Sequence, residues 1–403
     1  ISYNKHQSPN LGFGGYTGYD PMYSLLIWGS PDWNILDYKD YWLVPNEQQN
    51  NSYTAGNNNP YFDRYQRLRA YDRDVFNGQL TLNYTILKSL KATIRTGYDT
   101  YSDKQVVQIS QGSFQGGGNA RVMNRGGTEI WGESMRGSFN MGLSRGFSTN
   151  TEAIVTGETK INDFQLDGFV GGSIYYKEDE GIEARTQGGL SVPAYYSLKS
   201  SVNPAAVMSV NWKKQTNSIF GKVGVAWRNM AFLEATFRND WTSTLPKETR
   251  SYFYPSVSAS FIASDVLPKY DWLSIWKLRS NWTVAKGTPD IYEINNVYSI
   301  ATNQWNGLPT ATYPTAIRPS DVYSFASTSL EFGTQVGLFN NRVLADVTYF
   351  KKKIYDPLRM AAISEASGFS NVYTNTKDET ERRGWEISLN YTPIKKVAVC
   401  GGS

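Results

Sequence analysis

The chain has 403 residues, of which 14% are aromatic, with 28 Tyr, 12 Trp, 35 Gly and a net charge of +4; this excess of Tyr, Trp and Gly favours β structure over helix. One Cys and one His exclude a disulfide framework, a His-dependent catalytic triad and a metal site built from several such ligands. The longest basic run is the triplet at 351–353, so no nucleic-acid-binding surface is expected.

Residues 1–65 are rich in Tyr, Trp, Pro, Asn and Gly and show little alternation. This composition predicts an elaborate loop region and not a separate domain. The chain opens without Met and closes on a short Gly-Gly-Ser tail, so we expect it to be part of a longer polypeptide. No apolar run reaches the roughly 18 residues that a membrane-spanning helix needs.

From residue 66 onward, apolar and polar side chains alternate in short segments. In 76–84, Phe76, Leu80 and Leu82 occupy one parity and polar residues the other. Because successive side chains of a strand point to opposite faces, each such segment predicts a two-faced strand. About eleven strands follow, at residues 76–84, 90–100, 149–161, 164–176, 219–227, 231–241, 254–263, 275–284, 330–338, 343–349 and 383–391.

The expected connections between these strands alternate in length. Short ones fall near 85–89, at 162–163, at 228–230, near 264–274, at 340–341 and at 392–394. Long ones fall near 101–148, 177–218, 242–253, 285–328 and 354–382. A meander of this kind has one tight end and one elaborate end, as an up-and-down barrel does. We interpret residues 131–143, which also alternate, as a hairpin inside the first long connection.

Aromatic side chains gather near both ends of the expected strands, as the two interfacial girdles of a membrane barrel require. The girdle candidates are Tyr84, Trp227 and Trp276 near the short turns, and Tyr98, Trp241, Tyr254, Tyr349 and Trp385 towards the long connections. For any one ring, ordinary cross-strand packing is the alternative. Eleven strands without covering helices also exceed what an open sheet carries. We therefore predict an all-β fold, with residues 66–403 forming part of a large antiparallel transmembrane β-barrel.

Five segments, in this order, resemble the barrel of SusC/RagA-type TonB-dependent outer-membrane transporters. They are NPYFDRYQRLRAYDRDVFNGQLTLNYTILKSLKATIRTGYDTY (59–101), FRNDWTSTLPKETRSYFYPSVSASFIAS (237–264), WKLRSNWTVAKGTPDIYEINNVYS (276–299), SLEFGTQVGLFNNRVLADVTYFKKKIYDPL (329–358) and GFSNVYTNTKDETERRGWEISLNYTP (368–393). The resemblance implies a 22-stranded barrel with an N-terminal plug in a bacterial outer membrane. About half of its strands are expected here, with residues 1–65 as extracellular loop and the plug and final strands outside this chain.

The resemblance further implies a non-enzymatic importer of glycans, oligosaccharides or peptides. It would be energised through TonB, which contacts the missing N-terminal region, and lidded by a SusD-like lipoprotein, with a dimeric assembly of transporter–lipoprotein pairs as an open option. The alternatives are a passive porin-like or adhesin-like barrel and a secreted carbohydrate-binding β protein.

Large aromatics without alternating context are the candidates for contacting a ligand or the lipoprotein lid. They are Trp28, Trp33, Trp42, Tyr195, Tyr196 and Trp305. Packing within their own loops is the alternative. The acidic residues Glu178, Asp179, Glu180 and Glu183 could hold Ca²⁺ through oxygen ligands, against the alternative of a solvated charged loop. No other cofactor is expected, apart from Ca²⁺ in the extracellular loops or in the lipoprotein partner.

Overall fold

The computed structural model describes residues 1–10, 26, 34–50, 58–113, 120–123, 129–132, 136–300, 305–306 and 308–392, with the backbone alone given for 120–123 and 129–132. Its described helices are α2 (Pro60–Gln66) and the short 3₁₀ turns η1 (Ile35–Tyr38), η3 (Leu198–Ser200), η4 (Ala263–Asp265) and η5 (Glu365–Ser367). No helix in these ranges is both long and apolar enough to cross a membrane.

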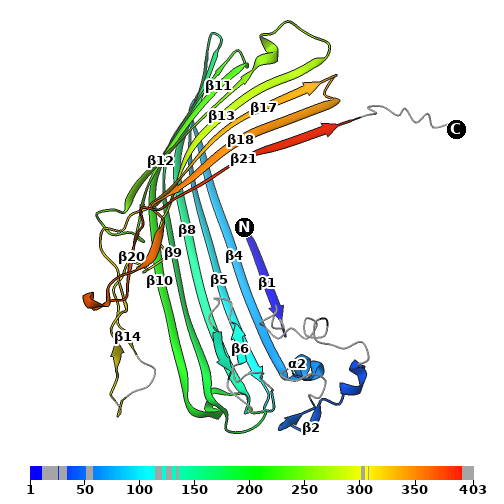
Figure 1. Cartoon of the computed structure of the whole chain (residues 1–403), viewed down its shortest axis with the longest axis vertical. Coiled ribbons are helices and arrows are strands. Elements are labelled where there is room, and N and C mark those ends of the chain that lie inside the picture. Colours follow the sequence, from blue (N-terminus) through cyan, green and yellow to red (C-terminus); the bar gives the residue numbers. More distant parts are fainter. Residues whose placement is uncertain are drawn as a thin grey trace, which may run out of the picture. The chain divides into compact units, whose positions relative to one another are not determined.

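Twelve long strands form one sheet, in the order β1-β4-β5-β8-β9-β10-β11-β12-β13-β17-β18-β21 (Figure 1). They are β1 (Ser2–Ser8), β4 (Arg67–Leu87), β5 (Leu90–Ile109), β8 (Ser138–Ile161), β9 (Phe164–Leu190), β10 (Ser201–Trp227), β11 (Ala231–Thr242), β12 (Ser251–Ile262), β13 (Leu273–Gly287), β17 (Phe325–Leu338), β18 (Val343–Tyr355) and β21 (Glu379–Tyr391). From β4 onward, each strand of this sheet pairs with the strand of the same sheet that follows it in the sequence, which is an up-and-down meander.

Four small sheets lie in the long connections. They pair β2 (Trp42–Val44) with β3 (Gln48–Gln49), β6 (Ala120–Met123) with β7 (Glu129–Gly132), β14 (Ser299–Ile300) with β15 (Ala311–Thr312), and β16 (Ala316–Ile317) through β20 (Asn371–Asn375) to β19 (Leu358–Ala362). All eleven strands expected from the alternation are confirmed as members of the large sheet, the segment 254–263 running one residue past the end of β12.

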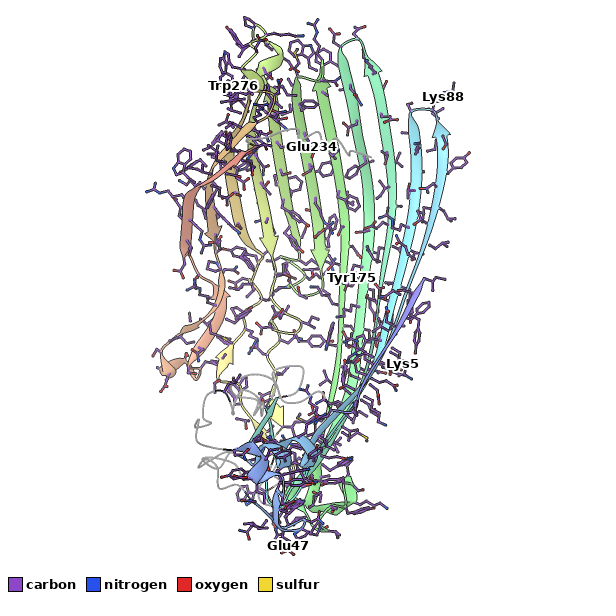
Figure 2. The ribbon with its side chains drawn as sticks, turned by 90° about the vertical axis from the view of Figure 1, so that its right-hand side faces the viewer. Lys5, Glu47, Lys88, Tyr175, Glu234 and Trp276 are labelled. Carbon is purple, nitrogen blue, oxygen red and sulfur yellow. The ribbon has the colours of Figure 1, made fainter. Side chains whose placement is uncertain are left out.

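Four of the short connections are tight turns, as expected. The β12–β13 connection is not, because it runs over 263–272, includes η4, and is longer than the β11–β12 connection at 243–250, which was expected to be long. Asn162, Arg228 and Asn229 adopt positive φ, and so do Phe339, Asn340 and Asn341 between β17 and β18. Asparagine tolerates this left-handed conformation better than most residues do. Figure 2 shows Lys88 at the turn between β4 and β5. The expected short connection at 392–394 lies beyond the described residues except for Thr392.

The two parities of each strand separate into an apolar and a polar face. In the β11–β12 pair, Ala235 lies opposite Val257 on the apolar face, while Thr236 lies opposite Ser256 on the polar face. The Thr236 and Ser256 hydroxyls are 2.6 Å apart and share a hydrogen bond. Leu233, Val223 and Val257 remain exposed on the apolar face. Apolar side chains left exposed in such rows are what lipid-facing strands require.

Three expectations about the long connections need correction. Residues 1–65 are not all loop, because β1 pairs antiparallel with β4 from Ser2–Asn77 to Ser8–Tyr71. Residues 177–218 are mostly strand, since β9 continues to Leu190 and β10 begins at Ser201. A hairpin does lie in the first long connection, but it is β6–β7, and the segment from Ser138 to Leu143 belongs to β8.

The chain divides into two compact units. The first holds residues 1–78, 98–148 and 177–213, and the second holds 79–97, 149–176 and 214–403. In the first unit, α2 is positioned by Asn59, whose side chain accepts hydrogen bonds from the Tyr61 and Phe62 amides, with Pro60 in the first turn. Phe62 is fully buried. In the second unit, the buried residues Leu245, Val322 and Tyr373 form a hydrophobic core.

Candidate functional site

The polar face of the second unit carries charges that are paired between neighbouring strands. Lys222 on β10 contacts Asp167 on β9 at 3.0 Å and Glu234 on β11 at 3.1 Å, so one ammonium bridges two carboxylates (Glu234 is labelled in Figure 2). Gly224 leaves the space these carboxylates use, because a Cβ there would lie 2.5 Å from an Asp167 oxygen. The polar face therefore carries ordered charges that link neighbouring strands.

A second ion pair joins two strands that are not neighbours in the sheet. Arg279 on β13 donates to both Asp346 oxygens on β18, at 2.8 and 2.6 Å, and to the Thr348 hydroxyl at 2.6 Å. The guanidinium passes over Gly333 on the intervening β17, where a Cβ would meet the Arg279 Nε at 2.5 Å. These contacts place Asp346 and Thr348 on the polar face. Bidentate Arg–carboxylate pairs of this kind fix geometry as well as charge.

An open pocket of about 290 Å³ lies on the second unit between these ion pairs. Its lining includes Asp167, Glu234, Arg279, Asn281 and Glu331. Hydrogen-bonding groups of both charges line it, so it can bind polar groups. Nothing in its lining supplies an activated nucleophile.

The Asp240 carboxylate organises a third cluster on the polar face. It is buried and accepts hydrogen bonds from the Arg238 Nε at 2.8 Å and from the Tyr254 hydroxyl at 2.7 Å. Arg238 also donates to the Ser218 hydroxyl at 2.9 Å. Tyr254 was expected in a membrane girdle. Its bond to Asp240 places it on the polar face, because its parity on β12 is that of Ser256 and not of Val257.

The other girdle candidates have the apolar parity of their strands. Tyr84, Tyr98 and Trp385 are exposed, the Tyr349 and Trp385 rings lie 5.0 Å apart, and the Trp276 indole donates to Thr334 at 3.1 Å. Trp227 pairs opposite Ala231, and Trp241 opposite Ser251. An interfacial role for these seven rings stays a prediction.

Three long connections of the second unit pack into one body. Leu245 comes from the β11–β12 connection, Val322 from β13–β17 and Tyr373 from β18–β21, and the three side chains share a core. The Asn375 amide donates to the Tyr323 and Asp356 carbonyls at 2.9 and 3.0 Å. Burial and the Glu293 carboxylate beside its hydroxyl raise the pKa of Tyr373 to about 12. The loops at this end are thus an ordered body.

The connections of the first unit meet around α2 through buried polar groups. The Gln49 side chain donates to the Asn58 side chain and to the Gly112 carbonyl, both at 2.6 Å. Asn58 in turn donates to Asp63 at 2.7 Å, and Arg67 does so at 3.0 Å. Buried polar networks that are well paired specify one arrangement of the segments they join.

Two of the aromatic ligand candidates pack within this α2 region. The Trp42 ring lies 5.2 Å from the Phe62 ring, edge to face. The Tyr196 hydroxyl bonds to Ser110, which also bonds to Gln66 at 2.5 Å. Both rings therefore have structural contacts, which is the alternative that the sequence left open.

The remaining candidates are placed differently. Tyr195 is 54% exposed and Trp305 is 81% exposed, so their rings are free to contact another molecule. They belong to different units. Trp28 and Trp33 lie outside the described residues.

The acidic candidates for Ca²⁺ lie on β9, not in a loop, so their side chains alternate between faces. Lys213 pairs with Glu178 at 3.0 Å, Lys177 with Asp179 at 3.3 Å, and Arg145 with Glu180. No group of three or more metal-ligating side chains occurs in the described part of the chain. Three of the four acids on β9, Glu178, Asp179 and Glu180, thus form ion pairs, and a role in holding Ca²⁺ stays a prediction.

One cross-strand contact in the first unit escaped the sequence analysis. The Tyr101 hydroxyl on β5 donates to Asp179 on β9, across β8. Gly146 on β8 makes this possible, since a Cβ there would lie 2.1 Å from the Asp179 oxygen and 2.7 Å from the Tyr101 ring. A glycine on the polar parity of a strand was the available signal in each case, at Gly146, Gly224 and Gly333.

The whole strand meander resembles that of one known protein family. The family model of the TonB dependent receptor-like β-barrel matches residues 4–396, nearly the whole chain. The chain belongs to this family. Its members are outer-membrane transporters, not enzymes, which agrees with the predicted fold class and with a bacterial outer-membrane location.

Curated relatives include two TonB-dependent receptors of Formosa agariphila. P26 is 25% identical over 61% of this chain and 26% of its own length, and P3 is 28% identical over 43% of this chain and 18% of its own. The chain thus spans about a quarter or less of the relatives it matches. Among solved structures, the RagAB peptide transporter aligns with a TM-score of 0.71 at 17% identity, covering 87% of this chain and 37% of that one. This likeness confirms the fold.

Proposed function

We propose that the protein containing this chain is an energised outer-membrane importer that works with a SusD-like surface lipoprotein. Its cargo would be a peptide, glycan or oligosaccharide too large for a passive porin. The observation that carries the proposal is the family match over residues 4–396, made by a chain whose strands fold like those of the RagAB peptide transporter. RagAB is a peptide transporter, which favours a peptide as cargo.

The parts of this chain have distinct tasks in the proposed importer. The apolar parity faces lipid, and the polar parity faces the lumen, where its fixed ion pairs present a charged wall to plug and substrate. The packed loop body around Leu245, Val322 and Tyr373 would form the extracellular end, against which a lipoprotein lid closes. Exposed rings such as Tyr195 and Trp305 suit that contact, because large aromatics are common interface anchors.

Uptake by whole cells tests the proposal. Cells that express the full-length protein with its neighbouring lipoprotein should accumulate labelled oligopeptide or oligosaccharide, and should lose this uptake when the proton gradient is collapsed or the TonB gene is deleted. Uptake that persists unchanged without energy would contradict an energised importer and favour the passive porin-like alternative.

Two biochemical observations separate the remaining alternatives. The lipoprotein should co-purify with the transporter in detergent, and one that never does so would remove the lid from the proposal. A secreted carbohydrate-binding protein would stay monodisperse without detergent, whereas strands with rows of exposed apolar residues should aggregate.

A further inference from the structure

The first unit contains an open pocket on the polar side of its strands. It has a volume of about 420 Å³, within the range of pockets that bind small ligands. Its wall comes from β4, β5, β8, β9 and β10, with Tyr71, Tyr101 and Trp212 as its aromatic residues. The pocket therefore combines side chains from five strands that are separated along the chain.

Carboxylates dominate the charge of this wall. Asp103, Asp179, Glu180 and Glu183 line it, and no Lys or Arg is among its lining residues. Arg73, Lys177 and Arg145 pair with Asp103, Asp179 and Glu180 from outside the lining, and Glu183 also interacts with another part of the chain. Four carboxylates against these three cations leave a net negative charge, so anionic ligands are disfavoured, whereas hydrogen-bond donors and cations are attracted.

The surroundings of the pocket already bind two cationic groups of the chain itself. The Lys177 ammonium lies 3.3 Å from Asp179 and 4.8 Å from the centre of the Trp212 ring. The Arg73 guanidinium lies 3.5 Å from Asp103 and 5.1 Å from the centre of the Tyr101 ring. A carboxylate beside an aromatic face is a recurring way to recognise ammonium and guanidinium groups.

Asn140 provides an independent observation. Its side chain lines the pocket and is 3% exposed, yet its Nδ2 has no hydrogen-bond partner among the described residues. A buried amide nitrogen without an acceptor is costly and calls for an explanation. A ligand that brings a carbonyl oxygen into the pocket would satisfy it. Peptides carry such a carbonyl at every residue.

We propose that this pocket is a subsite for a cationic residue of a peptide. The ammonium or guanidinium group binds the carboxylate wall, a backbone carbonyl accepts from Asn140, and the aliphatic part of the residue lies against Met208 and Val210. This inference rests on the proposed function and names its substrate class: peptides that contain Lys or Arg.

Equilibrium binding to the full-length protein, purified in detergent, tests the subsite. The probes are a fluorescent N-acetylated Ala-Lys-Ala-Ala amide and the same peptide with an acetylated lysine, which removes only the charge. The lysine peptide should bind at least about tenfold more tightly, and its affinity should fall as salt is raised.

Substitutions assign this binding to the pocket. Glu183→Gln and Asn140→Ala should each weaken binding of the lysine peptide about tenfold. Glu365→Gln removes a carboxylate from η5 in the other unit and should leave the affinity unchanged. Heat-modifiable migration in gels, compared among the three variants, identifies any that fail to fold. A variant that does not fold is replaced by Glu183→Ala or Asn140→Ser.

Three outcomes would overturn the subsite: equal affinity for the two peptides, tighter binding of a glutamate-containing peptide, or tighter binding of a neutral oligosaccharide such as maltopentaose. Failure of the subsite can be distinguished from failure of the proposed importer. If cells import peptides with no preference for lysine, the subsite fails alone. If the purified protein shows the preference but cells do not import, the proposed importer fails alone.

Discussion

Tyr101 and Asp179, which lie 78 residues apart in the chain, form a hydrogen bond across an entire intervening strand. The bond exists because Gly146 on β8 presents no side chain between them. Arg279 and Asp346 do the same across Gly333. Glycine on the polar face thus lets strands that are not neighbours be linked directly, which adds lateral connections to those of the backbone ladder.

Replacing Gly146 with Ala should break the Tyr101–Asp179 contact. The new Cβ would lie 2.1 Å from the Asp179 oxygen, so the carboxylate must move and lose a bond to a buried charged group, at a cost of about 1–3 kcal/mol. Urea unfolding in detergent, followed by Trp fluorescence, measures the change. Gly142→Ala on the same strand is the control, because nothing lies within 4 Å of a Cβ there. Equal free energies of unfolding for the two variants would show that the Tyr101–Asp179 hydrogen bond does not stabilise the protein.

The Arg279–Asp346 pair should show strong energetic coupling. A double-mutant cycle with Arg279→Lys and Asp346→Asn is expected to give a coupling free energy of about 1–3 kcal/mol. Lysine keeps the positive charge but cannot donate two parallel hydrogen bonds to the carboxylate. The matched comparison is the largely exposed pair of Arg228 in the β10–β11 turn and Asp163 in the β8–β9 turn, at 2.9 Å, whose coupling free energy should be under about 1 kcal/mol. Similar values for both pairs would show that geometry adds nothing here.

Two successive residues of β12 test which face meets lipid. Val257→Arg on the apolar face should destabilise the folded protein in liposomes by about 2–4 kcal/mol, while Ser258→Arg on the polar face should cost much less. Urea titration of folding into lipid vesicles reads out both. If the costs are reversed, the assignment of faces is wrong.

The loop body should loosen in strong alkali through Tyr373. Its pKa is raised to about 12, so the folded state holds the phenolic proton more tightly than the unfolded chain, whose tyrosines titrate near 10. The stabilisation is complete below pH 10 and is lost as the pH rises from 10 to 12. The difference in tyrosinate absorbance between wild type and Tyr373→Phe should show a midpoint near 12. A midpoint near 10 would mean that neither burial nor the Glu293 carboxylate raises the pKa of Tyr373 in solution.

Local alternation was sufficient to predict much of this protein. The period of two in segments such as 231–241 placed the strands, and the turn residues around Asn340 and Asn341 placed the tight end, because both signals depend only on neighbours in the chain. Strand β1 was missed because its sequence, SYNKHQS, carries almost no apolar parity, and it is held by pairing with β4 some 75 residues away. Tyr254 was misassigned because an aromatic ring at a strand end fits either face.

The sequence by itself thus determined the fold class, the order of the strands, the division into a tight and an elaborate end, and the family. Only the tertiary structure decided which side chains meet: Tyr101 with Asp179, Arg279 with Asp346, and the five strands that line the pocket around Asn140. The physical reason is that alternation fixes the face of a side chain, whereas its partners depend on the register of two or more strand pairs. Register arises from the whole sheet, and no local segment specifies it.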